Sequence, residues 1–446
     1  MWCTLKRSAT VGSVSPLPPG LPYPRAVQTL GWIARPGPFM ERCRARYGDV
    51  FTLRVAHEGT WIMLSEPEAI KQVFTGDPRV LRAGEANAIL RPFVGRRSVL
   101  LLDEPEHMVQ RKLMLPPFHG ERMQRYGALM RAVAEREIES WPTAEPVALW
   151  PRMQAVTLEV IMRAVFGFAE GSRLDRLREL LRHMLDWTTS TRQLAAMAVL
   201  GPDRVERRKS FRAVLNPVDA LLFEEIGARR ADPSLSERDD ILSMLLLARH
   251  EDGEPMSDAE LRDELVTLLV AGHETTATSL AWALERLLRH PEALHRLRDE
   301  VAAGEDAYLD AVIKETLRLR PVLPIVVRRL AEPMEIGGWK LPAGVSVAPC
   351  VYLLHRREDL YPEPTRFRPE RFLERPAGTY TWIPFGGGVR RCLGASFALF
   401  EMKTVLAAVV SRARLRPADA RPERIARRAI TLTPARGAEA LVEAAG

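Results

Sequence analysis

The stretch Phe385-Gly386-Gly387-Gly388-Val389-Arg390-Arg391-Cys392-Leu393-Gly394 is the part of this 446-residue sequence that decides the fold. Its three successive glycines allow a tight loop that closely approaches whatever it surrounds, and its arginines can meet anionic groups. The apolar run at residues 393–410 predicts a helix directly after the thiol. A cysteine at a helix N-terminus in an electropositive setting is expected to favour the thiolate, as an iron ligand or as a nucleophile.

A phosphate-binding function of the same loop is excluded. No Gly-Lys-Ser/Thr sequence follows the glycines, and no nucleotide-type strand with an acidic partner flanks them. A cysteine can also be an inert, buried free thiol, which is the usual fate of this residue inside a cell. From the loop alone, the reactive and the inert interpretation of Cys392 both remain open.

The charge of the chain does not indicate a nucleic-acid partner. It has 64 Lys plus Arg against 57 Asp plus Glu, a formal net charge of +7. The arginines alternate with acids on predicted helix faces, as in residues 292–300, and this pattern is typical of solvated helix surface. No block of like charges and no nucleic-acid motif accompanies them, so we expect none of these partners.

The chain is expected to form a single domain over residues 1–446, because no linker, repeat or low-complexity tract divides it. Residues 1–25 should form an extended proline-rich segment, since proline fixes its own φ angle and restricts the preceding residue. Residues 1–15 contain no apolar run long enough for a signal peptide or a membrane span. We therefore expect no membrane anchor and a cytoplasmic monomer. Disulfide and zinc spacings are absent among the four cysteines, Cys3, Cys43, Cys350 and Cys392.

Short strand patterns stand on either side of a long helical region. Apolar residues recur at helical spacing over residues 104–300. Before this region, residues 51–55 and 61–64 predict a hairpin, and residues 67–74 a short helix. After it come extended pieces at residues 326–330, 334–336 and 346–349, and residues 429–433 with 440–442 predict a closing hairpin.

The longest helical pattern covers residues 257–289 and is chemically unusual in its middle. Ser257 and Glu260 form a capping-box pattern at its start, and its length corresponds to roughly 50 Å. The central sequence Ala271-Gly272-His273-Glu274-Thr275-Thr276 contains a glycine that costs about 1 kcal/mol in a helix. Residues that are unfavourable in the middle of a helix often mark a functional site. Alternatively, the Thr hydroxyls can hydrogen-bond to a backbone carbonyl one turn back, and the helix is then merely bent. A zinc-protease helix is excluded, because the residue four positions after His273 is Ala277.

The loop pattern Phe-Gly-x-Gly-x-Arg-x-Cys-x-Gly resembles the haem-ligand loop of the cytochromes P450. The resemblance is carried by Phe385, Gly386, Gly388, Arg390, Cys392 and Gly394. It implies that Cys392 is the axial ligand of a b-type haem (iron protoporphyrin IX). It also implies a mainly α fold with small β-sheets, in which a long central helix lies over the haem.

The middle of the long helix resembles the oxygen-activation groove of the same family, Ala/Gly-Gly-x-Asp/Glu-Thr-Thr/Ser. The resemblance implies that Ala271 and Gly272 leave room for dioxygen. It further implies that Thr275 hydrogen-bonds the oxygen being activated and that Glu274 relays protons. Glu274 stands where soluble members commonly have an aspartate, a minor departure.

Two further motifs match the family. Glu315 and Arg318 lie one helical turn apart, which by itself suggests a surface ion pair. Together with Arg371 they match the family motifs Glu-x-x-Arg and Pro-Glu-Arg-Phe, which implies a buried structural charge network rather than catalysis.

His107 and Arg111 match the family motif His-x-x-x-Arg. The resemblance implies that they bind the haem propionates together with Arg390 and Arg328. Arg329 could replace Arg328, because the sequence does not fix which face that strand presents.

The resemblance covers nearly the whole chain and implies a haem-thiolate monooxygenase that hydroxylates or epoxidises an apolar substrate with O2. No flavin or iron-sulfur signature is present, so electrons are expected from a ferredoxin or flavodoxin with its NAD(P)H-linked reductase. Arg391 is a candidate for the positive patch that would meet an acidic carrier. Two rival functions are a peroxygenase of the same fold and a haem-based sensor.

Family position also implies an apolar substrate pocket. The early sequence, residues 32–36 and 47–50, resembles that of bacterial members related to fatty-acid hydroxylases, so a fatty acid or terpenoid is the expected substrate. The predicted pocket residues are Phe93, Leu101, Trp187, Thr267, Val270, Ile325, Val326 and Ile430.

Overall fold

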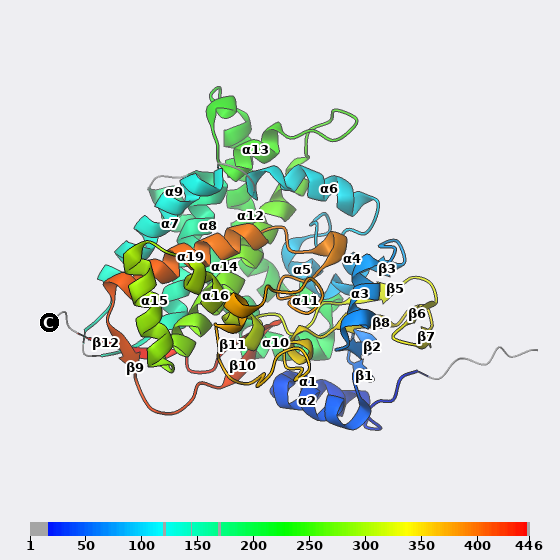
Figure 1. Cartoon of the computed structure of the whole chain (residues 1–446). Helices are drawn as coiled ribbons and strands as arrows, with labels where there is room; N and C mark the ends of the chain where they lie inside the picture. Colours follow the sequence, from blue (N-terminus) through cyan, green and yellow to red (C-terminus); the bar gives the residue numbers. More distant parts are fainter. Residues whose placement is uncertain (1–16, 119–121, 144, 168–170, 444–446) are drawn as a thin grey trace, which may run out of the picture.

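The computed structural model describes residues 17–118, 122–143, 145–167 and 171–443, and most of them are helical (Figure 1). The expectations for residues 1–15, including Cys3, lie outside the described residues. The longer helices are α1 (Arg25–Ala34), α2 (Pro36–Tyr47), α3 (Pro67–Thr75), α6 (Glu106–Met114), α7 (Arg122–Glu139), α8 (Leu149–Phe166), α9 (Ser172–Thr189), α10 (Thr191–Leu200), α12 (Lys209–Arg230), α13 (Ile241–Leu247), α14 (Asp258–Leu288), α15 (Pro291–Ala303), α16 (Ala307–Leu319) and α19 (Ala395–Arg412). The short ones are α4 (Ala83–Ala86), η1 (Ala88–Leu90), α5 (Arg91–Val94), η2 (Pro116–Phe118), α11 (Pro202–Glu206), η3 (Leu235–Glu237), α17 (Val351–Leu354), α18 (Arg371–Glu374) and η4 (Gly388–Arg390).

The strands form small sheets at the edges of the helical body (Figure 1). The largest sheet has the order β1-β2-β8-β5-β3 and is built from β1 (Val50–Val55), β2 (Gly59–Leu64), β3 (Leu81–Arg82), β5 (Arg328–Leu330) and β8 (Ser346–Pro349). The others pair β6 (Met334–Ile336) with β7 (Trp339–Leu341), β10 (Ile425–Arg428) with β11 (Thr431–Pro434), and β12 (Glu439–Val442) with β4 (Pro146–Ala148) and β9 (Leu415–Pro417). The predicted mainly α fold with small sheets is confirmed.

Helix α14 runs through the middle of the molecule. It begins with the predicted capping box, in which Ser257 accepts from the Glu260 amide and Glu260 accepts from the Ser257 amide. Two otherwise unpaired amides of the first turn are thereby satisfied. Nearly every side chain from Leu261 to Leu288 is buried, whichever way it points. A helix buried on all sides must lie inside the body, and this position explains why α14 can contribute to an internal site.

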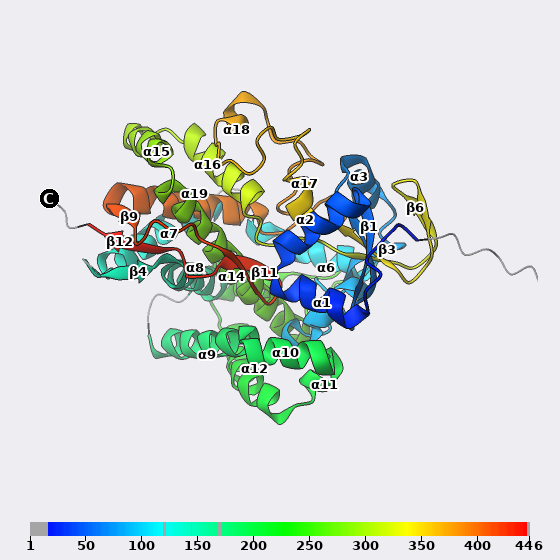
Figure 2. The ribbon, with the colours of Figure 1, turned by 90° about the horizontal axis from the view of Figure 1, so that it is seen from below.

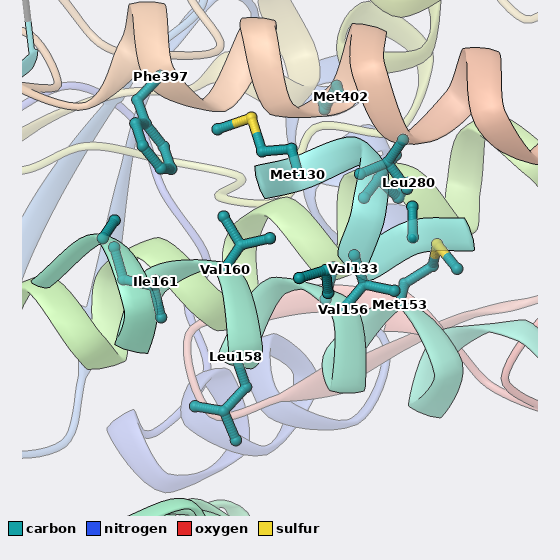
Figure 3. Packing of buried hydrophobic residues seen from close by; sticks show 14 of the residues in the cluster. Met130, Val133, Met153, Val156, Leu158, Val160, Ile161, Leu280, Phe397 and Met402 are labelled. Carbon is teal, nitrogen blue, oxygen red and sulfur yellow. The ribbon is translucent and has the colours of Figure 1, made fainter. Parts of the chain in front are cut away.

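The main core surrounds α14 and is assembled from helices far apart in the sequence. Figure 3 shows side chains from α7, α8, α14 and α19 packed together. The labelled residues are Met130, Val133, Met153, Val156, Leu158, Val160, Ile161, Leu280, Phe397 and Met402. This packing fixes α19, and with it the loop that precedes it, relative to α14.

The predicted first hairpin and the short helix after it are confirmed as β1, β2 and α3. The predicted closing hairpin is wrong. Strand β11 pairs with β10 through a turn at Ala429, whose φ is 52°, whereas β12 pairs with β4 and β9. Pairing with a strand far upstream depends on the tertiary arrangement, which a local strand pattern does not contain.

None of the described helices combines the length and the apolar character that crossing a membrane would require.

Candidate active site

The glycine loop is held in a conformation that only glycines adopt readily. Gly386 and Gly388 have φ angles of 68° and 65°, in the left-handed region where a Cβ atom is strained. A Cβ at Gly388 would lie 2.2 Å from the carbonyl oxygen of Phe74 on α3. At the end of the loop the Cys392 amide donates to the Phe385 carbonyl at 3.0 Å. The loop therefore fits tightly against α3 and places Cys392 just before α19.

Cys392 borders an internal opening. The residue is exposed to solvent, yet burial raises the pKa of its thiol, with the Gly394 amide, Arg111 and Arg391 acting in the opposite direction. A side chain that is both accessible and crowded by protein lines an opening within the fold. The positive groups favour the thiolate, as the sequence predicts, but desolvation has the larger effect on the thiol pKa. A bound metal would further favour the thiolate, because metals deprotonate a coordinating thiol.

A group of cations from separate elements gathers beside this loop. Arg390 donates to Asp103 at 3.1 Å and to the Leu102 carbonyl at 2.5 Å. Its charge lowers the pKa of His107 and of Arg328, after burial as the larger cause, and Arg111 acts in the same way on Arg390. The structure thus brings together all the predicted propionate partners, from α6, β5 and the loop.

Two of these cations have no carboxylate partner in an ion pair among the described residues. Asp103 pairs with Arg390, and Glu104 accepts from or donates to His107 at 2.7 Å. Within the described part of the chain Arg111 forms no ion pair, and Arg328 donates only to the carbonyl of Val327, at 2.8 Å. Burial lowers the pKa of Arg328 to about 10. Burying a guanidinium without an anionic partner is unfavourable in free energy. This site is therefore expected to bind anionic groups.

The structure also separates Arg328 from Arg329. Arg328 is 7% exposed and lies beside Arg390, whereas Arg329 turns outward and pairs with Glu85 at 2.9 Å. Neighbouring residues of a strand point to opposite faces. Arg328 is therefore the one that faces the cation group.

In the middle of α14 a short accessible patch interrupts the burial. Ala271 is exposed and Val270, Gly272 and Thr275 are partly exposed, while the residues on either side are buried. The Thr275 hydroxyl donates to the Ala271 carbonyl at 2.7 Å, as Thr commonly does one turn back in a helix. The helix continues through this point without a break.

Gly272 lies within this patch and also close to helix α8. A Cβ added there would lie 3.3 Å from Ile161 of α8. The glycine therefore allows α8 and α14 to pack closely.

Glu274 lies on the α8 side of the helix. One carboxylate oxygen accepts from Gln154 at 2.8 Å, and the other is buried without a hydrogen-bond partner among the described residues. Burial raises the pKa of this carboxyl, while Arg428 and Gln154 oppose the shift. A carboxyl of this kind holds a proton more readily than an exposed one.

The comparisons with known proteins agree with this geometry. Residues 16–441 match the family model for cytochrome P450. The chain belongs to the cytochrome P450 family. Putative cytochrome P450 135B1 of Mycobacterium tuberculosis strain H37Rv is 44% identical over 439 residues, which cover 96% of this chain and 92% of that protein. Putative cytochrome P450 137 of the same strain is 39% identical over 429 residues, covering 94% and 90%.

Solved structures of the family have the same fold. The retinoic-acid-bound cyanobacterial CYP120A1 superposes with a TM-score of 0.84 at 25% identity, covering 96% of this chain and 99% of that one. The haem domain of cytochrome P450DA gives 0.80 at 24% identity, covering 96% and 98%. The protein is thus a cytochrome P450 monooxygenase, and its family implies haem b as the cofactor.

The residues around Cys392 fit haem b. Haem b brings an iron for the thiolate and two propionate carboxylates, and the cation group contains two arginines, Arg111 and Arg328, for which the described residues provide no carboxylate partner. The buried Arg390 Nε also has no hydrogen-bond partner among the described residues. The two propionates of haem b would supply one negative charge for each of these two arginines.

The predicted charge network comes together in the interior of this P450. Arg318 donates to both oxygens of Glu315, at 2.7 and 2.8 Å, and Arg371 donates to one of them at 3.2 Å. Both partners of the first pair are fully buried. Arg318 also donates to the carbonyls of His355 and Pro364. The network joins α16 to α18 and to the segment that leads into the cysteine loop.

Only some of the predicted pocket residues lie near one another in the structure. Phe93 and Trp187 both approach Phe211, with ring centroids 5.5 and 5.8 Å apart. The Thr267 hydroxyl is buried and lies 2.7 Å from that of Ser98. Val326 lies beside the Gly386 loop, at 3.6 Å from a Cβ built there. Ile430 is 42% exposed; Leu101, Val270 and Ile325 are partly buried.

Sequence reasoning missed several residues that shape the site. Phe211 joins two predicted pocket residues across helices. Asp103 and Glu104 pair with Arg390 and His107, and Gln154 donates to Glu274. The adjacent acids immediately before Pro105 were a weak signal in the sequence. Phe211 and Gln154 carry none, because only the packing of α8 and α12 brings them here.

Proposed function

We propose that this enzyme inserts one oxygen atom of O2 into an apolar, lipid-like substrate, by hydroxylation or epoxidation. The observation that carries this proposal is the accessible Cys392 near two arginines, the partly buried Arg111 and the buried Arg328, that have no carboxylate partner among the described residues. Haem b, held by the Cys392 thiolate, would activate dioxygen through successive one-electron reductions. Residues 1–446 are proposed to act as one domain.

The chain's own residues would bind and orient the cofactor. Cys392 provides the thiolate, and Arg111, Arg328, Arg390 and His107 hold the propionates by charge-assisted hydrogen bonds. The loop residues Phe385, Gly386 and Gly394 keep the thiol in place. These assignments are supported by the Phe385 carbonyl, which accepts from the Cys392 amide, and by the effect of Arg390 on the pKa of Arg328 and of Arg111 on that of Arg390.

Proton delivery is assigned to the other side of the opening. The Glu274 carboxyl holds a proton at its unpaired oxygen, because burial raises its pKa. The Thr275 hydroxyl, now donating to Ala271, can turn to hand a proton to the accessible patch. Ala271 leaves the space where oxygen and substrate meet.

The proposed substrate class is a fatty acid or a terpenoid. The aromatic group of Phe93, Trp187 and Phe211 would form an apolar wall, as ligand pockets generally have. The solved relative CYP120A1 carries retinoic acid, an isoprenoid carboxylic acid. At 25% identity this supports the substrate class and not an individual compound.

Electrons are proposed to come from a ferredoxin or flavodoxin with its NAD(P)H-linked reductase. On the cysteine loop Arg391 is exposed and Val389 is 40% exposed. A positive charge next to an apolar side chain suits an acidic carrier protein, because charge steers the encounter and apolar contact holds it.

The deciding experiment is the carbon monoxide difference spectrum of the reduced, haem-loaded enzyme, with Cys392→Ser as the comparison. We expect the absorption band characteristic of thiolate ligation in the native enzyme and its loss in the variant. Absence of the band from the native enzyme, or its retention in the variant, would contradict the proposal. A screen for fatty acids and terpenoids that shift the Soret band then identifies the substrate.

A further inference from the structure

Helix α1 packs against the largest sheet with its polar side chains inward. Gln28 and Thr29 are 2% and 8% exposed. Gln28 accepts from the amide of Arg54 at 2.8 Å, and Thr29 accepts from the amide of Ala56 at 2.9 Å. These amides belong to the outer edge of β1, beyond its bridge between Thr52 and Gly20, and to the residue after the strand. The two side chains therefore satisfy donors that would otherwise remain unpaired.

Trp32 of α1 also points inward and is 3% exposed, but the other large apolar side chains of the helix point outward. The segment presents Tyr23, Val27, Leu30 and Ile33, which are 52%, 51%, 66% and 37% exposed. A surface helix normally does the reverse and buries its apolar stripe. Figure 2 looks onto α1, and no described element covers it in that view. Because hydrogen bonds fix the helix in this orientation, its apolar face is a built feature of the surface.

The charges around α1 are almost all positive. Residues 17–57 contain six arginines and two acids, Glu41 and Asp49, and the next acid, Glu58, is partly buried and lies near Arg427. Both acids are already paired within the fold, Glu41 with Arg356 and Asp49 with Arg44 and Arg357. The other five arginines have no ion pair among the described residues, and all five are exposed: Arg25, Arg35, Arg42, Arg46 and Arg54. Arg25 begins α1 and Arg35 follows its end.

We propose that the apolar face of α1 binds the surface of an anionic lipid bilayer, with the helix lying in the plane of the headgroups. Apolar side chains on one face and surrounding arginines are what an interfacial helix needs, because burial of the first and attraction of the second add together. A second copy of the chain fits this face poorly. A two-fold contact would bring its arginines against the same arginines of the partner.

The size of α1 predicts weak and reversible binding. A helix of 10 residues spans only about 15 Å and inserts few side chains. Attraction between the arginines and anionic headgroups must therefore contribute much of the affinity. This attraction is screened by salt over a Debye length of about 10 Å at 0.1 M ionic strength, so binding should fall as salt rises.

The experiment is co-sedimentation of the haem-loaded full-length enzyme with extruded vesicles. One set contains equimolar phosphatidylglycerol and phosphatidylcholine, and the other contains phosphatidylcholine alone. The test variant is Val27→Gln/Leu30→Gln/Ile33→Gln. The matched control is Phe223→Gln/Leu247→Gln, which removes apolar side chains that are 44% and 42% exposed elsewhere. Circular dichroism and the Soret band verify that each variant is folded.

We expect the native enzyme to sediment with the anionic vesicles and to be released at about 0.5 M salt. The triple variant should bind roughly tenfold or more weakly, and the control variant should bind like the native enzyme. No binding to anionic vesicles, or equal binding by the triple and control variants, would overturn the proposal. So would binding that persists in the triple variant but is lost on deleting residues 1–16. A dimer that the triple substitution abolishes would assign the face to a second copy instead.

Discussion

The buried network around Glu315 gives the sharpest prediction for stability. Replacement of Glu315 by glutamine keeps the shape of the side chain and removes its charge. In the native chain this carboxylate accepts from Arg318 at 2.7 and 2.8 Å, from Arg371 at 3.2 Å and from the Arg368 amide at 2.8 Å. Two guanidinium groups that are 0% and 7% exposed would then lose their only carboxylate partner in the network. Such a loss costs about 3–5 kcal/mol of unfolding free energy.

The chain contains a matched control for this change. Glu363 and Arg366 are also three residues apart and form an ion pair at 3.3 Å, but they are 63% and 65% exposed. Exposed pairs contribute less than about 1 kcal/mol, so Glu363→Gln should leave stability nearly unchanged.

Urea-induced unfolding, followed by tryptophan fluorescence and by the Soret band, measures both variants. We expect a clearly lower midpoint for Glu315→Gln, with the Soret signal lost no later than the fluorescence change. Equal midpoints for the two variants would refute the reasoning, because burial would then make no difference to the energy of the pair.

Three further outcomes are expected. Thr275→Ala should release hydrogen peroxide in place of product during NAD(P)H-driven turnover, whereas fully coupled oxygenation would exclude the proposed proton transfer. Arg391→Glu should slow reduction by the carrier protein without changing the Soret band, and unchanged reduction kinetics would remove this residue from the docking surface. Burial raises the pKa of Glu264 to about 8, so the folded state keeps a proton that the unfolded state loses above about pH 4.5. Stability should therefore fall by about 1.4 kcal/mol per pH unit between these values, and Glu264→Gln should flatten that slope in urea titrations; an unchanged slope would contradict the assignment.

Features that depend on neighbouring residues in the sequence were predictable. The capping box at Ser257 and the glycine loop are local, and the structure has both where the sequence places them. The long helix was also predictable, because its apolar residues and its start and stop signals are contained within one segment.

Features that depend on a partner from elsewhere in the chain were not predictable. The choice between Arg328 and Arg329 needed the strand register, which pairs Arg329 with Ser346 and turns it toward Glu85. The role of Gly272 needed Ile161 from another helix. The direction in which the pKa of Cys392 shifts depends on how much protein surrounds the thiol, and the sequence shows only the charges nearby.

The cation group also links the cofactor to the stability of the fold. Arg390 lowers the pKa of Arg328 and Arg111 lowers that of Arg390, in both cases after burial as the larger cause, and Asp103 and Glu104 compensate only part of the charge. Without anions these elements repel one another across the opening. A dianionic cofactor that binds the folded state alone would remove this repulsion and stabilise the fold by mass action. The same arginines that orient the haem would therefore make the folded chain dependent on it, so that a chain lacking the cofactor keeps α6, β5 and the cysteine loop together less firmly.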